Sequence, residues 1–257
     1  MSTGAPGIDT DELLAEMPGL LRYARILVGP ADAEDLVQDT VVRALESGGS
    51  FRADASLRTW LHRILYHRFV DLARARGAIP MEDDELTARI EAAWQDDDYT
   101  VDAEVVVGRA QLRDDLMDAL SHLPVAQRSA VVWHDMEGMT SAEVALAAGV
   151  SLPAAKQRLR RGRAALVTLL SGDDPRGTPR PGIPMRCWQA RSKVDDYLDG
   201  ELTSEERVAL ERHLGGCPTC PGLYAGIVGV RDAMGRLRDP DTVVPDSVAA
   251  RIRGATG

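Results

Sequence analysis

Apolar residues in this chain recur at helical spacing in short segments, and each segment stops at glycine or proline. The clearest run covers residues 33–46, where Val37, Val41, Ala44 and Leu45 form one stripe opposite an acidic face. Aromatic residues make up only 4% of the chain. This pattern favours several small helical bundles over one large β core. We therefore predict an all-α fold.

The same periodicity sets approximate helix bounds. Gly29-Pro30, Gly48-Gly49 and Gly138 are stop signals, and Pro18-Gly19 is a candidate break. Thr140 and Glu143 match a capping box, and Ser151 caps the helix after Gly149. Helices are expected over residues 11–28, 33–46, 56–76, 86–94, 107–121, 125–135, 201–214, and immediately after Thr140 and Ser151.

Charge is distributed unevenly along the chain. The net charge of −10 argues against a protein that simply coats nucleic acid. However, residues 81–104 hold ten acidic residues and one basic residue, whereas residues 151–166 hold five basic residues and no acidic one. A basic segment on an acidic chain can contact phosphate if the acidic parts lie elsewhere.

The beginning of the chain and its cysteine count bear on its location. Residues 1–16 are polar and acidic, and no apolar run approaches the roughly 20 residues that cross a bilayer. We expect a cytoplasmic protein. Three cysteines in such a protein favour metal or redox chemistry over structural disulfides.

All three cysteines fall in the C-terminal part, with one histidine at ligand spacing. His213, Cys217 and Cys220 form His-x3-Cys-x2-Cys, and Cys187 lies upstream. The histidine precedes Cys217 by one helical turn, and the Cys pair can reach one ion across a turn. Four such ligands fill the tetrahedral positions of one structural Zn²⁺ and leave none for water.

Two other interpretations of these residues are weaker. Cys217 and Cys220 alone could form a redox pair, as in a thiol oxidoreductase, and His213 could be a surface residue. A redox Cys-x-x-Cys usually follows a strand and opens a helix, whereas this one ends a helical stretch. Zinc is therefore the favoured interpretation, and we predict that the protein is not an enzyme.

Two short helices around Gly149 form a candidate helix-turn-helix. The second helix is basic and is expected to enter the major groove, with its first residues near base edges and its arginines on phosphates. An ordinary solvated basic helix is the alternative. The candidate residues for contact with DNA here are Ser151, Ala154, Ala155, Lys156, Arg158, Arg160, Arg161 and Arg163.

Two blocks of sequence resemble the sigma-70 family of RNA polymerase sigma factors. Residues 32–40 (DAEDLVQDT) resemble its region 2.2. Residues 123–128 (LPVAQR), 137–140 (EGMT) and 156–163 (KQRLRRGR) resemble region 4 of the extracytoplasmic-function (ECF) group. The resemblance covers roughly residues 10–170. Gly162 departs from an ideal helix, and either allows a close backbone approach or frays the helix.

The resemblance implies roles for the N-terminal residues. The acidic face would bind core RNA polymerase through Asp32, Glu34, Asp35 and Asp39, although such charges are often merely solvated. Region 4 would read the −35 promoter element. The −10 element would be contacted and opened by Arg58, Trp60, His62, Arg63 and His67, with Trp60 equally plausible as a core residue.

The C-terminal ligands lie in a second resemblance. Cys187-Trp188, residues 196–202 (DYLDGEL), Glu205-Glu206 and residues 213–220 resemble the zinc-binding anti-sigma domain. In that family the metal holds a small helical bundle that packs on sigma domains and blocks polymerase. Apolar residues after Tyr224 could pack on the sigma domains or complete the zinc module.

Together these features predict a sigma factor regulated by its own zinc module, with core RNA polymerase and promoter DNA as partners. Alternatives are a DNA-binding regulator that never joins polymerase, and a zinc module that activates or senses metal or redox state. The expected segments are a region 2 domain (1–80), an acidic linker (81–106), a region 4 domain (107–171), a Gly/Pro linker (172–184), the zinc module (185–230) and a tail (231–257).

Overall fold

The computed structural model describes residues 8–47, 55–76, 84–172 and 185–238, together with residues 244–245, 249–250 and 253. These residues form helices and no strand, so the predicted all-α class is confirmed. The Gly48-Gly49 stop, most of the predicted Gly/Pro linker and most of the tail lie outside the described residues. The chain forms two compact units: residues 1–81, 132–156 and 238–257 make the first, and residues 82–131 and 157–237 the second.

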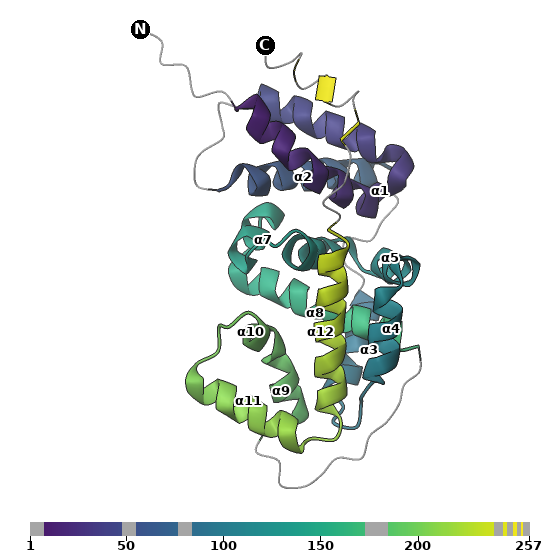
Figure 1. The fold of residues 1–257 in the computed structure, drawn as a ribbon, viewed down its shortest axis with the longest axis vertical. Coiled ribbons are helices and arrows are strands. Elements are labelled where there is room, and N and C mark those ends of the chain that lie inside the picture. Colours follow the sequence, from purple (N-terminus) through teal and green to yellow (C-terminus); the bar gives the residue numbers. More distant parts are fainter. Residues whose placement is uncertain are drawn as a thin grey trace. The chain divides into compact units, whose positions relative to one another are not determined.

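The first unit is built on two long helices, α1 (Thr10–Glu46) and α2 (Leu57–Arg76) (Figure 1). Asp9 caps α1 by accepting hydrogen bonds from the N–H groups of Asp11 (2.8 Å) and Glu12 (3.1 Å). Gly29, at φ 78°, kinks α1 where two helices were predicted to part. Pro18, however, causes no break, because Gly29 is the position inside α1 with non-helical dihedrals.

Part of the sequence that resembles region 4 completes this unit. The π-helix η2 (Val132–Met136) precedes α7 (Ser141–Ala148), which packs against α2. The predicted capping box of α7 is present, and Gly149 ends the helix in the left-handed conformation at φ 67°. Glu143 also lies 3.4 Å from the Thr59 hydroxyl of α2. The cap therefore joins the two helices as well as starting one.

The second unit contains α3 (Asp84–Gln95), α4 (Ala103–Gln111), α5 (Arg113–His122), α6 (Val125–Val131) and α8 (Leu152–Ser171) from residue 157 onward. One helix was predicted over 107–121, but Leu112 takes extended dihedrals (φ −81°, ψ 115°) and divides it into two. Gly162 is buried in α8 at a point that leaves no room for a side chain. An added Cβ would lie 2.6 Å from Val131 Cγ2 and 3.0 Å from the Gln127 carbonyl oxygen. It permits close helix packing and does not fray the helix.

The zinc-module helices belong to the same unit: α9 (Cys187–Ser192), α10 (Val194–Leu198), α11 (Ser204–Gly216) and α12 (Cys220–Arg236). Thr203 and Glu206 form a capping box on α11. In the acidic linker predicted over residues 81–106, called the acidic connector below, Tyr99 and Val101 are buried. No described helix combines the length and the apolar character needed to cross a bilayer.

Candidate metal centre and nucleic-acid interface

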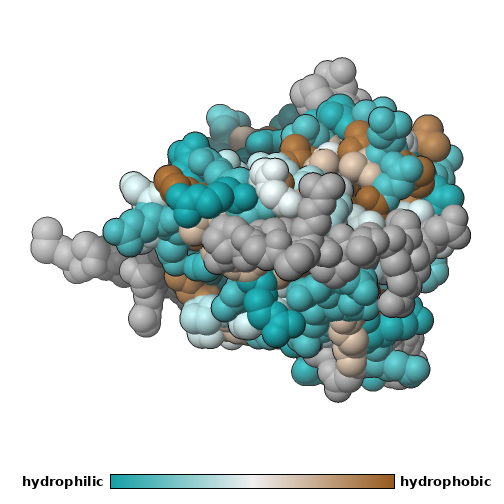
Figure 2. Space-filling view, turned by 90° about the horizontal axis from the view of Figure 1, so that it is seen from below, coloured by the Kyte–Doolittle hydropathy of each residue, from teal (hydrophilic) through white to brown (hydrophobic). Residues whose placement is uncertain are grey.

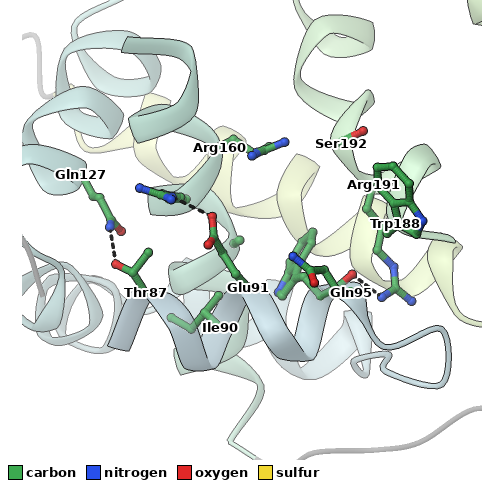
Figure 3. Close-up of a pocket in the computed structure, with 12 residues that line it drawn as sticks. Thr87, Ile90, Glu91, Gln95, Gln127, Arg160, Trp188, Arg191 and Ser192 are labelled. Atoms are coloured by element: carbon green, nitrogen blue, oxygen red, sulfur yellow. Dashed lines mark hydrogen bonds and ion pairs between the residues drawn. The ribbon is translucent and has the colours of Figure 1, made fainter. Parts of the chain in front are cut away.

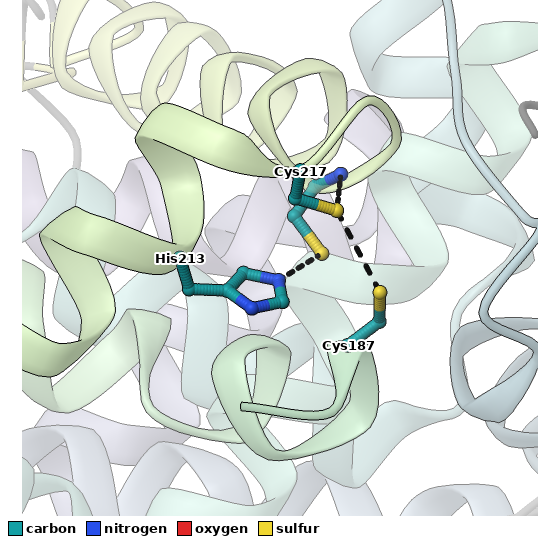
Figure 4. A group of neighbouring side chains, drawn as sticks. Cys187, His213 and Cys217 are labelled. Carbon is teal, nitrogen blue, oxygen red and sulfur yellow. Dashed lines mark hydrogen bonds between the residues drawn. The ribbon is translucent and has the colours of Figure 1, made fainter. Parts of the chain in front are cut away.

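Three helices bring the four predicted metal ligands together. Cys187 begins α9, His213 lies in the last turn of α11, Cys217 caps that helix, and Cys220 begins α12. All four are buried, and their ligand atoms lie within 4.8 Å of one another (Figure 4). The side chains of Cys187, His213 and Cys217 face a common point in Figure 4, and Cys220 joins them although it lies 33 positions after Cys187 in the sequence.

The spacing of these atoms fits a tetrahedral ion. Two thiolates bound at the usual Zn–S distance would be about 3.7 Å apart. Cys187 Sγ and Cys217 Sγ lie 3.6 Å apart, and His213 Nε2 lies 3.3 Å from Cys220 Sγ. No disulfide joins the cysteines. The residues present therefore suit Zn²⁺ without rearrangement.

The ionisation of the ligands depends on their burial. Burial raises the pKa of the Cys187 and Cys220 thiols, and it lowers the pKa of His213, which keeps the imidazole in its neutral, metal-binding form. Burial also pushes the pKa of Cys217 upward, but hydrogen bonds from Thr219 and from the Cys220 N–H outweigh it and bring that pKa below its ordinary value. A bound dication would favour the thiolate at every cysteine.

Thr219 and Arg191 connect the cysteine turn to the acidic connector. The Thr219 hydroxyl lies 3.3 Å from Cys217 Sγ and donates to the Asp97 carbonyl oxygen at 3.1 Å. Arg191 donates to the carbonyl oxygens of Trp94 (2.8 Å), Asp96 (2.7 Å) and Tyr99 (2.7 Å). These hydrogen bonds tie residues 94–99 to α9 and to the turn between Cys217 and Cys220. Neither residue was singled out from the sequence, because side-chain bonds to a distant backbone leave no local pattern.

Helix α12 packs on α4 through a row of glycines. An added Cβ would lie 2.6 Å from the Val101 carbonyl oxygen at Gly222 and 2.4 Å from Val107 Cγ2 at Gly229. At Gly226 it would lie 3.2 Å from Val167 Cγ1 of α8. The backbone of α12 thus approaches both helices more closely than any other residue type would allow.

The basic helix α8 is engaged by acids of the same unit. Arg163 is fully buried and forms an ion pair with Asp195 of α10. Arg161 Nε lies 2.7 Å from Glu91 Oε1 of α3. Beside that pair is a cavity of about 100 Å³, lined by α3, α8 and α9 (Figure 3).

The other residues predicted to contact the −35 element differ in exposure. Ser151 is exposed, Ala155 is buried, and the remaining four are partly exposed: Ala154, Lys156, Arg158 and Arg160. Because Ala155 faces the interior, its predicted approach to base edges would require it to turn outward. Contact of these residues with DNA remains a prediction.

The predicted −10 residues divide between the surface and the interior of the first unit. Arg63 and His67 are exposed, Arg58 and Trp60 are partly exposed, and His62 is 1% exposed. Burial, with Arg58 and Arg22 nearby, lowers the pKa of His62 to about 3. Sequence patterns did not indicate that Trp133 and Glu137, from beyond the connector, would cover this histidine and its neighbours.

The predicted polymerase-binding residues lie along α1. Asp32, Asp35 and Asp39 are exposed and Glu34 is partly exposed. Asp39 Oδ2 lies 2.7 Å from Arg68 Nη2. In the view of Figure 2 hydrophilic residues predominate and hydrophobic ones are interspersed among them. Three of the four carboxylates thus lie at the surface of the first unit, and their contact with polymerase remains a prediction.

Three family models match the chain. The sigma-70 region 2 model covers residues 14–79, the sigma-70 region 4 model covers residues 113–166, and a zinc-finger model covers residues 187–220. The last of these includes all four candidate ligands. The order of the matches is the order expected from the sequence blocks.

Curated relatives give the same family. The ECF RNA polymerase sigma factor SigM of Mycobacterium tuberculosis is 37% identical over 139 residues, which cover 54% of this chain and 64% of SigM. The chain thus spans just under two thirds of that relative, and it spans 42% of the sigma factor SigG from the same species. A solved chain from the complex of the sigma factor RpoE with the anti-sigma factor NepR, from Bartonella quintana, aligns at 26% identity with a TM-score of 0.46 over 63% of this chain and 96% of its own length.

Two relatives are covered more completely. The RNA polymerase sigma factor NccH of Alcaligenes xylosoxydans xylosoxydans is 33% identical over 56% of this chain and 75% of its own length. The sigma factor EcfG of Rhodopseudomonas palustris is 32% identical over 63% of this chain and 85% of its own length. With sigma regions 2 and 4 both matched, this chain belongs to the family of ECF RNA polymerase sigma factors and carries a zinc-finger domain after region 4.

Proposed function

We propose that the chain initiates transcription as a sigma factor and that its own zinc module holds it inactive. In this proposal α8 reads the −35 element and the face of α2 contacts the −10 element. Core RNA polymerase binds the acidic face of α1, formed by Asp32, Glu34, Asp35 and Asp39. The protein acts in the cytoplasm, where polymerase and promoter DNA are found, and it performs no catalysis of its own.

The close packing of α12 on α4 and α8 supports inhibition by the zinc module. The glycine row allows this packing, and the buried pair of Arg163 and Asp195 adds a charged contact to α8. A short tether between the sigma regions and the module gives a local concentration of roughly millimolar, so a modest contact is enough to persist. Two of the arginines predicted to contact DNA, Arg161 and Arg163, are thus engaged by acids of the chain itself.

We further propose that one Zn²⁺ is held by Cys187, His213, Cys217 and Cys220. The ion would be structural, since the four protein ligands fill its coordination sphere. The ion would crosslink α9, α11 and α12. Hydrogen bonds from Arg191 and to the Thr219 carbonyl oxygen would then hold residues 94–100, which precede α4, against these helices.

The test is promoter-directed transcription with core RNA polymerase, comparing the full chain with a chain that ends at Ser171 and with Gly229→Leu. Leucine at 229 would drive its side chain into Val107 and separate α12 from α4. The matched control is Gly108→Leu, because a Cβ at Gly108 meets nothing within 4 Å. We expect both altered chains to transcribe about tenfold more than the full chain and the control to match it.

Two other outcomes would contradict the proposal in different ways. If the truncated chain and Gly229→Leu transcribe less than the full chain, the zinc module supports activity. If no form transcribes with core polymerase but the full chain still binds promoter DNA, the protein is a DNA-binding regulator that acts without polymerase.

A further inference from the structure

The first unit contains an aromatic box that holds the indole of Trp133. Ring centroids of Tyr23 and Tyr66 lie 5.2 and 5.4 Å from that of Trp133, and the His62 ring lies 6.4 Å away at 85°. Tyr23, His62 and Tyr66 come from α1 and α2, whereas Trp133 comes from η2. The indole is therefore inserted into a face of the region 2 helices by a segment from beyond the connector.

Three polar atoms in this box lack a hydrogen-bond partner within the part of the chain that the structure describes. Both ring nitrogens of His62 and the Nε1 of Trp133 are buried, and among the described residues none of the three has a hydrogen-bond partner. A core that served stability alone would rarely leave three such atoms unpaired. A planar ligand that carries donors and acceptors on its edge would suit the box better than an indole does.

Glu137, from the same segment, meets two guanidinium groups at the edge of the box: its carboxylate meets that of Arg22, and its backbone carbonyl meets that of Arg58. Glu137 is fully buried and accepts from Arg22 Nε at 3.0 Å and from Arg22 Nη2 at 2.9 Å. Arg58 Nη1 donates to the Glu137 carbonyl oxygen at 3.0 Å. The fork of arginine binds phosphate in the same bidentate geometry as it binds carboxylate.

We propose that this face of α1 and α2 binds one unstacked nucleotide of single-stranded DNA, and that Trp133 and Glu137 occupy it as an internal mimic of that nucleotide. The indole takes the place of a purine base and the carboxylate takes the place of its phosphate. The inference rests on the proposed function, because it gives that function a single-stranded ligand at residues predicted to contact the −10 element, Arg58 and His62. Displacing η2 is then required before the nucleotide can bind.

The chemistry of the face fits this ligand. Bases stack on aromatic side chains whatever their sequence, and an arginine fork holds the backbone. The edge of a purine supplies hydrogen-bond donors and acceptors that His62 lacks in the closed state. Because η2 belongs to the same chain, it competes at a high effective concentration and keeps the site closed.

The test measures binding of the full chain to a fluorescein-labelled single strand of roughly ten nucleotides by fluorescence anisotropy. Glu137→Gln and Arg22→Gln break the same ion pair, yet the mimic predicts opposite results. Glu137→Gln removes the competitor and should tighten binding about tenfold, the gain expected if the site is open one tenth of the time. Arg22→Gln removes the phosphate receptor and should weaken binding about tenfold, also in the Glu137→Gln background.

Matched variants separate this effect from simple changes of charge. Glu12→Gln and Arg25→Gln change the same charges at exposed positions of α1 and should stay within about twofold of the parent chain. Trp133→Phe, which keeps the core filled but shortens the ring system, should also tighten binding. A purely structural role for the pair predicts that Arg22→Gln and Glu137→Gln alter binding in the same direction, and that result would overturn the proposal.

Failure of the inference can be told apart from failure of the proposed function. The anisotropy assay needs no polymerase, and the transcription assay needs no change at Glu137. If the chain transcribes with core polymerase but Glu137→Gln does not tighten binding to the single strand, the proposed function stands and the mimic is wrong. If Glu137→Gln tightens binding but the chain does not transcribe with core polymerase, the nucleotide site stands and the proposed sigma activity is wrong.

Discussion

At the scale of single residues, the most informative positions are charged or polar groups held away from water. His62 has no hydrogen-bond partner among the described residues, and its neighbours include Arg58 and Arg22. Arg163 is buried with Asp195. His62 and Arg163 were both assigned to DNA contact from the sequence, and each lies inside its own unit in this structure. Because both groups are buried, their predicted contact with DNA would require a rearrangement of the fold.

The depressed pKa of His62 predicts a dependence of stability on pH. The folded value of about 3 lies below the ordinary 6.5, so the unfolded chain takes up a proton first as the pH falls. Stability is unaffected by this group above pH 6.5 and declines from there toward pH 3. At pH 5 the expected loss is about 2 kcal/mol relative to pH 7. Urea unfolding followed by tryptophan fluorescence measures it.

The control for this prediction is His62→Phe, which fills the box without a titrating group. The difference in unfolding free energy between pH 7 and pH 5 should shrink by about 2 kcal/mol in that variant. An unchanged difference would show that other groups cause the pH dependence.

At the scale of single elements, two helices begin with the same capping box but serve different units. Thr140 and Glu143 start α7, which packs on α2, whereas Thr203 and Glu206 start α11, which carries His213. In the first box a hydrogen bond from the backbone of Thr140 lowers the pKa of Glu143 below its ordinary value. In the second, Lys193 is the main cause that lowers the pKa of Glu206 to about 2.

These boxes predict different consequences for the same substitution. Thr140→Ala and Thr203→Ala should each destabilise their helix by about 1 kcal/mol. Only Thr203→Ala should weaken zinc binding, by up to about fivefold, because α11 positions two of the four ligands. A competition titration with a chromogenic chelator measures the affinity, and serine at either position should restore the parent value. Equal effects of the two alanine variants on zinc would contradict this assignment.

At the scale of the whole molecule, the zinc module has little apolar core of its own at the ligand site. The cluster there consists of Cys187, Cys217 and Cys220 with Leu214 packed against them. The helices that carry the upstream ligands are short: α9 has 6 residues and α11 has 13. Helices of this length are marginal in water without tertiary support. The metal is thus expected to supply much of the module's stability.

Removal of zinc with a chelator should therefore loosen the second unit selectively. We expect amide hydrogen exchange to accelerate in α9, α11 and α12 and in residues 94–100, which Arg191 and Thr219 hold, while α1 and α2 keep their protection. Cys217→Ser combined with Cys220→Ser should reproduce the effect without a chelator. Equal acceleration in α1 and α2 would show that the two units do not respond separately.

The sequence by itself determined the features that depend on neighbours along the chain. Helix ends follow from Gly29, Gly138 and Gly149, whose positive φ values end or kink helices where the sequence predicted. The His-x3-Cys-x2-Cys spacing predicted that these side chains converge, because a helical turn and a tight turn bring them together, and their ligand atoms do lie within 4.8 Å of one another and of Cys187 Sγ. The acidic and basic segments were equally evident, since they need no knowledge of distant residues.

Only the tertiary structure decided what each face meets. Arg163 pairs with Asp195, which lies 32 residues away in the sequence, and Glu137 pairs with Arg22, which lies 115 residues away in the sequence. The division of one predicted helix at Leu112 and the π-helical turn that carries Trp133 also have no local signal. The physical reason is that burial and ion pairing depend on which segments the chain brings together. The periodicity of a single helix shows only whether a face is apolar or charged. Which segment covers that face depends on the packing of the whole chain.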